Sequence, residues 1–193
     1  MLTQLTTIKT RLGLLDTDTT NDVVLTHAII AVSARFNREC NRTLERTEDL
    51  TEEFPADAVE ICPACYPIET IGKFELKVSE AEGWVEQTLV MCLVRRRCVI
   101  SLARPVGGPQ SQARVTYTGG YVLPGTAPTA GQVVLPADLE QAAVEQVAFW
   151  FQNRDRLGLQ RVWDYHATYR HFAALDLLPS VKAVLFGHTR WQG

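Results

Sequence analysis

Two runs of apolar residues near the N-terminus follow the three- and four-residue spacing of a helix. The first predicts a short helix over residues 2–12 that stops at Gly13, a residue favoured at helix C-termini. The second follows an acidic, Thr-rich turn, where Thr19 and Asp22 have the spacing of a capping box, and ends near Thr43. Its apolar face is predicted to lie against a core and is formed by Leu25, Ile29, Val32, Phe36 and Cys40.

Residues 135–156 predict one long helix that is covered on several sides. Pro136 suits the first helical position, and Asp138 and Glu140 oppose the positive end of the helix dipole. Only a narrow polar stripe interrupts the apolar surface, which includes Leu139, Val144, Val147, Trp150 and Phe151. Such a helix belongs to a hydrophobic core and carries no residues arranged for chemistry.

Between residues 47 and 118 the pattern changes to short runs rich in β-branched residues, separated by Gly, Pro and charged side chains. These runs predict a small, mostly antiparallel sheet inserted between helices, and residues 119–135 read as a linker. The predicted fold class is therefore α+β. A small helical bundle from residues 1–46 and 136–193, with one long buried core helix, carries an inserted β-rich subdomain.

The C-terminal part combines an aromatic segment with a short helix. Residues 161–172 alternate over part of their length and predict a strand or an extended arm, and residues 178–187 predict a helix with Pro179 near its start and Gly187 as its cap. The aromatic side chains either complete the chain's own core or form a partner interface, where aromatic residues are enriched. They are Trp163, Tyr165, Tyr169, Phe172 and Trp191.

Composition narrows the class of protein. A chain of 193 residues, 46% hydrophobic and 21% charged, is long enough for a sizeable core with a modest insertion. A formal net charge of −3 argues against a dedicated nucleic-acid binder. We find no apolar run of the ~18–20 residues that a membrane helix needs, and no signal peptide at the N-terminus. We expect a protein made in the cytoplasm.

Arginines gather in two places, and each group has two interpretations. The first group lies on one face at the end of the second predicted helix, as a solvated face or as a contact to an acidic partner or DNA: Arg35, Arg38 and Arg42. The second lies on a predicted strand, where consecutive side chains point to alternate faces: Arg95, Arg96 and Arg97. The group forms either an exposed sheet edge, where the charges prevent pairing with another strand, or a basic rim that faces a subunit, a portal or DNA.

The five cysteines predict reduced thiols, buried as small hydrophobic residues. Cys62 and Cys65 have a spacing found in zinc and redox sites. The second pair that zinc would need is missing, since Cys92 and Cys98 lie six residues apart, and no helix that a redox site would need follows Pro67. We expect a structural role, with a Cys62/Cys65 metal or redox protein as the alternative.

No catalytic motif is present. The four histidines form no His-Glu-x-x-His pattern, and the chain has neither a Gly-x-Ser-x-Gly elbow nor a phosphate-binding glycine loop. Nothing specific supports a cysteine hydrolase that uses Cys40 or Cys65 with His166, and Asp164 and His166 lack a third metal ligand at a suitable spacing. We expect no enzyme, catalytic residue, cofactor or metal.

Two segments together resemble a known family. The run Tyr117-Thr118-Gly119-Gly120-Tyr121-Val122-Leu123-Pro124-Gly125 and the helix at 135–156, with the two N-terminal helices and the acidic turn between them, look like the head–tail connector (adaptor, or head-completion) proteins of tailed bacteriophages. The resemblance covers both ends of the chain, roughly half of it, and rests on pattern and order.

The resemblance implies a structural virion protein at the head–tail interface, or neck. Such proteins form a ring, commonly a dodecamer, beneath the portal, extend the DNA channel and offer a surface to a stopper or tail protein. Double-stranded DNA would pass through the lumen without sequence-specific binding, and no membrane is involved. The family's C-terminal segment often docks on the portal, which implies a partner interface at the aromatic segment and at Leu178, Val181, Leu185 and Phe186. A stopper or tail-completion protein is the alternative within the neck.

Overall fold

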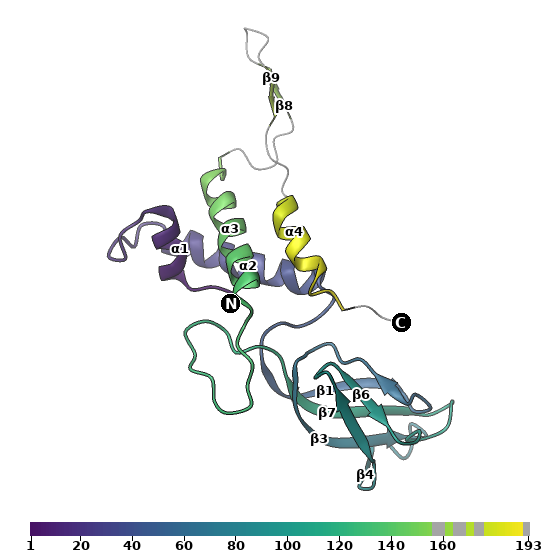
Figure 1. Ribbon diagram of the computed structural model, residues 1–193. Helices are drawn as coiled ribbons and strands as arrows, with labels where there is room; N and C mark the ends of the chain where they lie inside the picture. The colour runs from purple at the N-terminus through teal and green to yellow at the C-terminus, as the bar shows by residue number, and fades with distance from the viewer. Residues whose placement is uncertain (156–160, 164–168, 172–175, 191–193) are drawn as a thin grey trace. The chain divides into compact units, whose positions relative to one another are not determined.

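Contacts divide the chain into a helical unit and a β unit (Figure 1). The computed structural model describes residues 1–155, 161–163, 169–171 and 176–190. The helical unit comprises Met1–Cys40 and Leu135–Thr189, and the β unit comprises Asn41–Val134 together with Arg190. The predicted α+β class is confirmed. Residues 119–134, which read as a linker in the sequence, have their contacts within the β unit.

The helical unit is organised around the apolar helix α3 (Ala137–Gln152). This helix contacts the other three, α1 (Leu5–Leu12), α2 (Asp22–Glu39) and α4 (Pro179–Phe186). Three of its alanines, Ala142, Ala143 and Ala148, are almost fully buried, as expected of a helix that packs against three others. The prediction of a core helix is therefore confirmed, and its buried residues are Leu139, Ala142, Ala143, Val144, Gln146, Val147 and Ala148.

The helix starts differ from two sequence predictions. Pro136 precedes α3 as its N-cap instead of occupying the first helical position, and α3 ends at Gln152. No side chain caps α2, so the predicted Thr19 capping box is wrong. The Asp22 carboxylate instead accepts an ion pair at 2.6 Å from the buried Lys9 ammonium. A buried cation needs a counter-charge more than the helix end needs a cap, since the end remains open to water.

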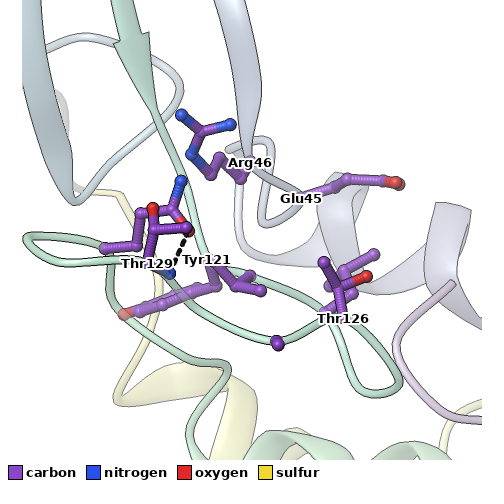
Figure 2. Close-up of a pocket in the computed structure, with 9 residues that line it drawn as sticks. Glu45, Arg46, Tyr121, Thr126 and Thr129 are labelled. Atoms are coloured by element: carbon purple, nitrogen blue, oxygen red, sulfur yellow. Dashed lines mark hydrogen bonds between the residues drawn. The ribbon is translucent and has the colours of Figure 1, made fainter.

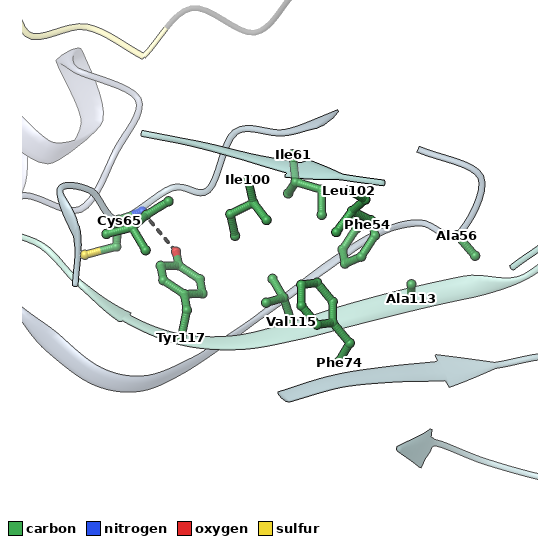
Figure 3. Close-up of a cluster of buried hydrophobic side chains, with 11 residues drawn as sticks. Phe54, Ala56, Ile61, Cys65, Phe74, Ile100, Leu102, Ala113, Val115 and Tyr117 are labelled. Atoms are coloured by element: carbon green, nitrogen blue, oxygen red, sulfur yellow. Dashed lines mark hydrogen bonds between the residues drawn. The ribbon is translucent and has the colours of Figure 1, made fainter. Parts of the chain in front are cut away.

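The β unit contains two antiparallel sheets that share one core (Figure 3). The larger has the order β1-β7-β3-β4, with the strands β1 (Thr47–Pro55), β7 (Gln112–Gly119), β3 (Ile68–Lys77) and β4 (Val85–Gln87). The smaller has the order β2-β6-β5, with the strands β2 (Glu60–Ile61), β6 (Val99–Leu102) and β5 (Cys92–Arg95). The predicted antiparallel arrangement is confirmed. Side chains from both sheets fill the core: Phe54, Ala56, Ile61, Cys65, Ile68, Phe74, Ile100, Leu102, Ala113, Val115 and Tyr117.

An ion pair between the half-buried Arg114 and the buried Glu75 connects β3 and β7. The Arg114 guanidinium donates to both Glu75 carboxylate oxygens, at 2.7 and 3.0 Å, and Lys73 adds an ion pair at 3.3 Å. The Arg114 guanidinium holds the pKa of the Glu75 carboxyl below its ordinary value, although desolvation opposes this effect. A bidentate contact of this kind stabilises the strand register in addition to pairing the two charges.

We expect this pair to make the β unit sensitive to acid. Because the pKa of Glu75 is lower in the folded than in the unfolded state, its stabilisation is complete above the unfolded value of about 4.3 and is lost as the pH falls through the folded value. Denaturation midpoints of the wild type and of Glu75→Gln, measured from pH 7 to pH 2.5, should converge at the acid end. Glu82→Gln, at an exposed position, should follow the wild type throughout. A constant gap between wild type and Glu75→Gln across this range would contradict the assignment.

Candidate assembly surfaces

The candidate residues around α4 do not all face outward. Val181 and Leu185 are 1% and 2% exposed and fill the core of the helical unit, and Leu178 is half-buried. The Leu178 amide donates to the buried Gln146 Oε1 at 2.8 Å, which ties the start of α4 to α3. Phe186 differs, with 66% of its surface exposed. Of these four candidates, Phe186 therefore presents the apolar surface that a partner could cover.

The aromatic segment contains a short antiparallel pair, β8 (Arg161–Trp163) and β9 (Tyr169–His171). The pairing register places Trp163 opposite Tyr169. The expectation of a strand or extended arm is met at these two strands. The remaining aromatic candidates, Tyr165, Phe172 and Trp191, lie outside the described residues.

The first group of arginines does not share one helix face. Arg35 pairs with Glu39 and with Asp176, and Arg38 is exposed. The prediction that Arg42 lies on this helix is wrong, because α2 ends at Glu39. Arg42 belongs to the β unit, where it is 5% exposed.

Arg42 instead takes part in a buried contact between a cation and aromatic rings. Its guanidinium lies 3.2 Å from the Tyr66 ring centroid and 5.3 Å from that of Tyr121, and it donates to the Tyr66 carbonyl. Stacking of this kind is typical of arginine in desolvated surroundings. Arg42 therefore holds the strand-connecting segments together and offers no free charge on a helix surface.

The second group of arginines forms the tip of a hairpin. Arg95 lies on β5 and pairs with Glu60, whereas Arg96 and Arg97 occupy the turn between β5 and β6. The prediction that all three lie on a strand is therefore wrong. Arg96 and Arg97 have φ values of +49° and +56°, a region that glycine and asparagine adopt more readily. All three side chains are exposed.

The Cys62–Cys65 segment is held by a hydrogen-bond network centred on Glu52. The Glu52 carboxylate accepts from the Ala64 amide at 2.7 Å, from the Tyr117 hydroxyl at 3.0 Å and from Arg190 at 3.2 Å. The Cys65 amide donates to the Tyr117 hydroxyl at 3.1 Å (Figure 3). Because side chains of the β unit hold the Ala64 and Cys65 amides, and the Thr43 amide donates to the Ala64 carbonyl at 2.8 Å, the arrangement of the segment has a structural explanation.

The cysteines themselves differ in exposure. Cys40 and Cys65 are buried, as expected, but Cys62 and Cys92 are exposed, so the prediction of uniformly buried thiols is wrong. Burial raises the pKa of the Cys65 thiol to about 11, which leaves little of the nucleophilic thiolate at neutral pH. Within the residues that the structure describes, no three His, Cys, Asp or Glu side chains are grouped to hold a metal ion.

A hollow of about 290 Å³ lies within the β unit, beside the segment that follows β7 (Figure 2). Glu45 and Arg46 are the charged residues in its lining, and Arg46 is already paired with Glu48 and Glu69, both at 2.7 Å. The Gln132 side chain accepts from the Thr129 amide across the loop at 2.9 Å. The lining brings together no nucleophile and base, and we assign it no chemistry.

An exposed apolar surface beside β5 had not been predicted. Leu89, Met91 and Leu93 are 80%, 75% and 64% exposed. Leu93 lies on β5, an edge strand of the smaller sheet, and the other two lie in the segment just before it. Large apolar side chains gathered at one exposed place mark interaction surfaces. The sequence signal was weak, since short apolar runs in a β-rich region are equally typical of a core strand.

Comparison with known proteins adds a fold relationship. The sequence matches no protein-family model and no curated protein. A chain in the neck of an empty gene transfer agent (GTA) particle, computed with C6 symmetry, is 14% identical and has a TM-score of 0.57, over 96% of this chain and 88% of the other. A chain in the virion of the native GTA particle is 15% identical, with a TM-score of 0.58, over 97% and 89%.

None of the helices formed by the described residues is both long and apolar enough to cross a membrane. The similarity to the two GTA chains extends over nearly the whole length of this chain, helices and strands together. At these sequence identities the likeness concerns the fold, and the chain shares its fold with chains of the neck and virion of a GTA particle.

Proposed function

We propose that this protein is a structural subunit of the neck of a tailed-phage-like particle. The observation that carries the proposal is the fold shared with a chain of the GTA neck, because the alignment covers 96% of this chain and therefore both the helical elements and the β unit. In this proposal its function is assembly instead of catalysis.

Within the neck, we assign the protein to the head–tail connector position. It forms a ring beneath the portal, extends the DNA channel and joins the capsid to the tail. A ring of twelve copies is compatible with the six-fold symmetry applied to the related neck. The long core helix α3 supports a connector over a stopper or tail-completion protein, whose folds tend toward β-barrels. The burial of Cys65, whose thiol donates to the Glu45 carbonyl, argues against the metal or redox alternative.

A single substitution on α4 tests the portal contact without removing core residues. Phe186→Asp changes an exposed apolar side chain, whereas Val181 and Leu185 are needed for folding. Negative-stain images of portal rings mixed with the wild type should show an extra coaxial layer. We expect Phe186→Asp to lower the fraction of rings with this layer at least about tenfold, because truncation at an interface centre costs more than ~2 kcal/mol.

The matched control is Leu15→Asp, which makes the same change at a position that is 74% exposed in the helical unit. It should leave the layer intact. Both variants should keep the wild-type denaturation midpoint. Portal rings that gain no layer from folded wild-type protein at micromolar concentration would overturn the connector assignment, whereas equal layers with wild type and Phe186→Asp would move the docking surface elsewhere.

A further inference from the structure

Charge in the β unit is segregated along the sequence. Residues 47–72 contain seven acidic side chains and no lysine or arginine. Residues 87–137 contain five arginines and no acidic side chain. The first stretch includes β1, an edge of the larger sheet, and the second includes β5, an edge of the smaller sheet. The β unit therefore has two chemically unlike edges.

Part of this charge is neutralised by ion pairs within the β unit. Glu52, Glu60 and Glu69 pair with Arg190, Arg95 and Arg46. Several exposed side chains form no ion pair with any residue that the structure describes. On the acidic side these are Asp49, Glu53 and Asp57, and on the basic side they are Arg96, Arg97 and Arg104.

The basic edge also carries the exposed apolar residues Leu89, Met91 and Leu93. A shallow hollow of about 280 Å³ lies next to them, with Met91, Ser101 and Ala103 in its lining. Apolar surface with arginines at its margin has the composition of a protein–protein interface, with an apolar centre and a polar rim. A purely solvated edge would not need three large apolar side chains beside it.

We propose that the acidic edge, formed by β1 and the turn at Asp57, contacts the basic edge, formed by β5, its hairpin tip and Arg104, in a second copy of this chain. The proposal rests on the ring assembly proposed above. Contacts that close a ring are heterologous, so each subunit needs two different and mutually complementary surfaces. Two β1 edges repel each other, as do two β5 hairpins, and only the unlike combination is attractive.

A second copy fits this surface better than DNA does. Arg95 of the basic edge is already paired with Glu60 of β2, and this carboxylate would oppose a phosphate backbone at that place. The whole chain is negatively charged, and its exposed leucines and methionine contribute nothing to phosphate contact. In contrast, every copy of the chain carries an acidic edge whose charge is complementary to that of the basic edge.

Charge reversal tests the contact directly. The first variant, Arg96→Glu with Arg104→Glu, makes both edges acidic. The second, Glu53→Lys with Asp57→Lys, makes both edges basic. Sedimentation velocity, with the protein free and with portal rings, measures association of copies. Each variant alone should associate at least about tenfold more weakly than the wild type, and an equimolar mixture should recover association, because acidic edges then meet basic ones in alternation.

Control variants carry the same change in net charge at exposed positions that belong to neither edge. They are Arg11→Glu with Arg38→Glu in the helical unit, and Glu82→Lys with Glu86→Lys before and on β4. Both should associate like the wild type. Wild-type association should weaken as salt is raised from 50 to 500 mM, since exposed charge pairs are screened.

The outcomes separate this contact from the connector role. Variants that assemble normally on the portal would refute the edge contact and leave the connector assignment standing. A wild type that binds no portal and does not self-associate would overturn both. If the arginine reversal lowers only retention of double-stranded DNA, while copies associate normally, the basic edge faces DNA and the proposed contact is wrong.

Discussion

Replacing Gly120 by alanine is expected to destabilise the β unit by about 3–4 kcal/mol. Gly120 has a φ of +104°, and a Cβ there would lie 2.6 Å from the Glu45 carbonyl oxygen and 2.7 Å from the Arg46 Cα. Both neighbours are backbone atoms, so the overlap cannot be relieved by a side-chain rotation. Strain at such a φ alone costs about 1–3 kcal/mol, and the overlap adds to it.

Gly131→Ala is the matched control for this substitution. Gly131 has a φ of +90°, but no atom lies within 4 Å of the position that its Cβ would take. It should cost only the strain, about 1–2 kcal/mol. At the ~2–4 °C per kcal/mol typical of chains of 150–250 residues, thermal denaturation of the whole chain should show a midpoint lower by about 10 °C for Gly120→Ala, against about 4 °C for Gly131→Ala. Equal shifts would mean that the close approach of the added Cβ to the backbone of residues 45 and 46 does not destabilise the β unit.

The neighbouring glycines Gly119 and Gly120 also show what the sequence could and could not predict. In the sequence these two glycines open the segment that reads as a linker. Their actual setting depends on long-range pairing, because Gly119 lies opposite both Thr47 and Ile68, and its Cβ would meet the Cys65 carbonyl at 2.6 Å. Nothing within ten residues of the glycines specifies these neighbours.

Helical faces were predicted well because their spacing is a local property. Leu25, Ile29, Val32, Phe36 and Cys40 are all buried as the periodicity indicated. Arg42 was misplaced because the pattern of Arg35 and Arg38 continues one step too far. Asn41, with a φ of +50°, ends the helix, and asparagine is among the residues that tolerate this conformation. That signal was available in the sequence.

The hairpin tip offered no comparable signal. The turn from β5 to β6 contains Arg96, Arg97 and Cys98, without the glycine, asparagine or proline that marks most turns. Only the pairing of Arg95 with Val99 reveals it. The exposed residues of β5 were hidden for a related reason, because which edge of a sheet stays uncovered depends on strand order and not on composition.

Removal of the Glu52 carboxylate is expected to be nearly as damaging as the change at Gly120. Glu52→Ala leaves the Ala64 amide, the Tyr117 hydroxyl and the Arg190 guanidinium without their shared acceptor. Burial, with the nearby carboxylate, raises the pKa of Tyr117, so its hydroxyl stays protonated and needs an acceptor. Unpartnered buried donors cost about 1–3 kcal/mol each, which predicts a loss of about 2–4 kcal/mol after partial rehydration.

The adjacent Glu53 provides the control, because it is exposed and forms no ion pair with a residue that the structure describes. Glu53→Ala should change the free energy of unfolding by less than about 0.5 kcal/mol. Urea denaturation, monitored by the fluorescence of the β unit, distinguishes Glu52→Ala from Glu53→Ala. Because Glu52 fixes the Cys62–Cys65 segment, Glu52→Ala should also make Cys65 react faster with a thiol reagent. A Cys65 thiol that stays equally protected in both variants would show that the network does not hold this segment, and a different explanation of the Cys62–Cys65 spacing would then be needed.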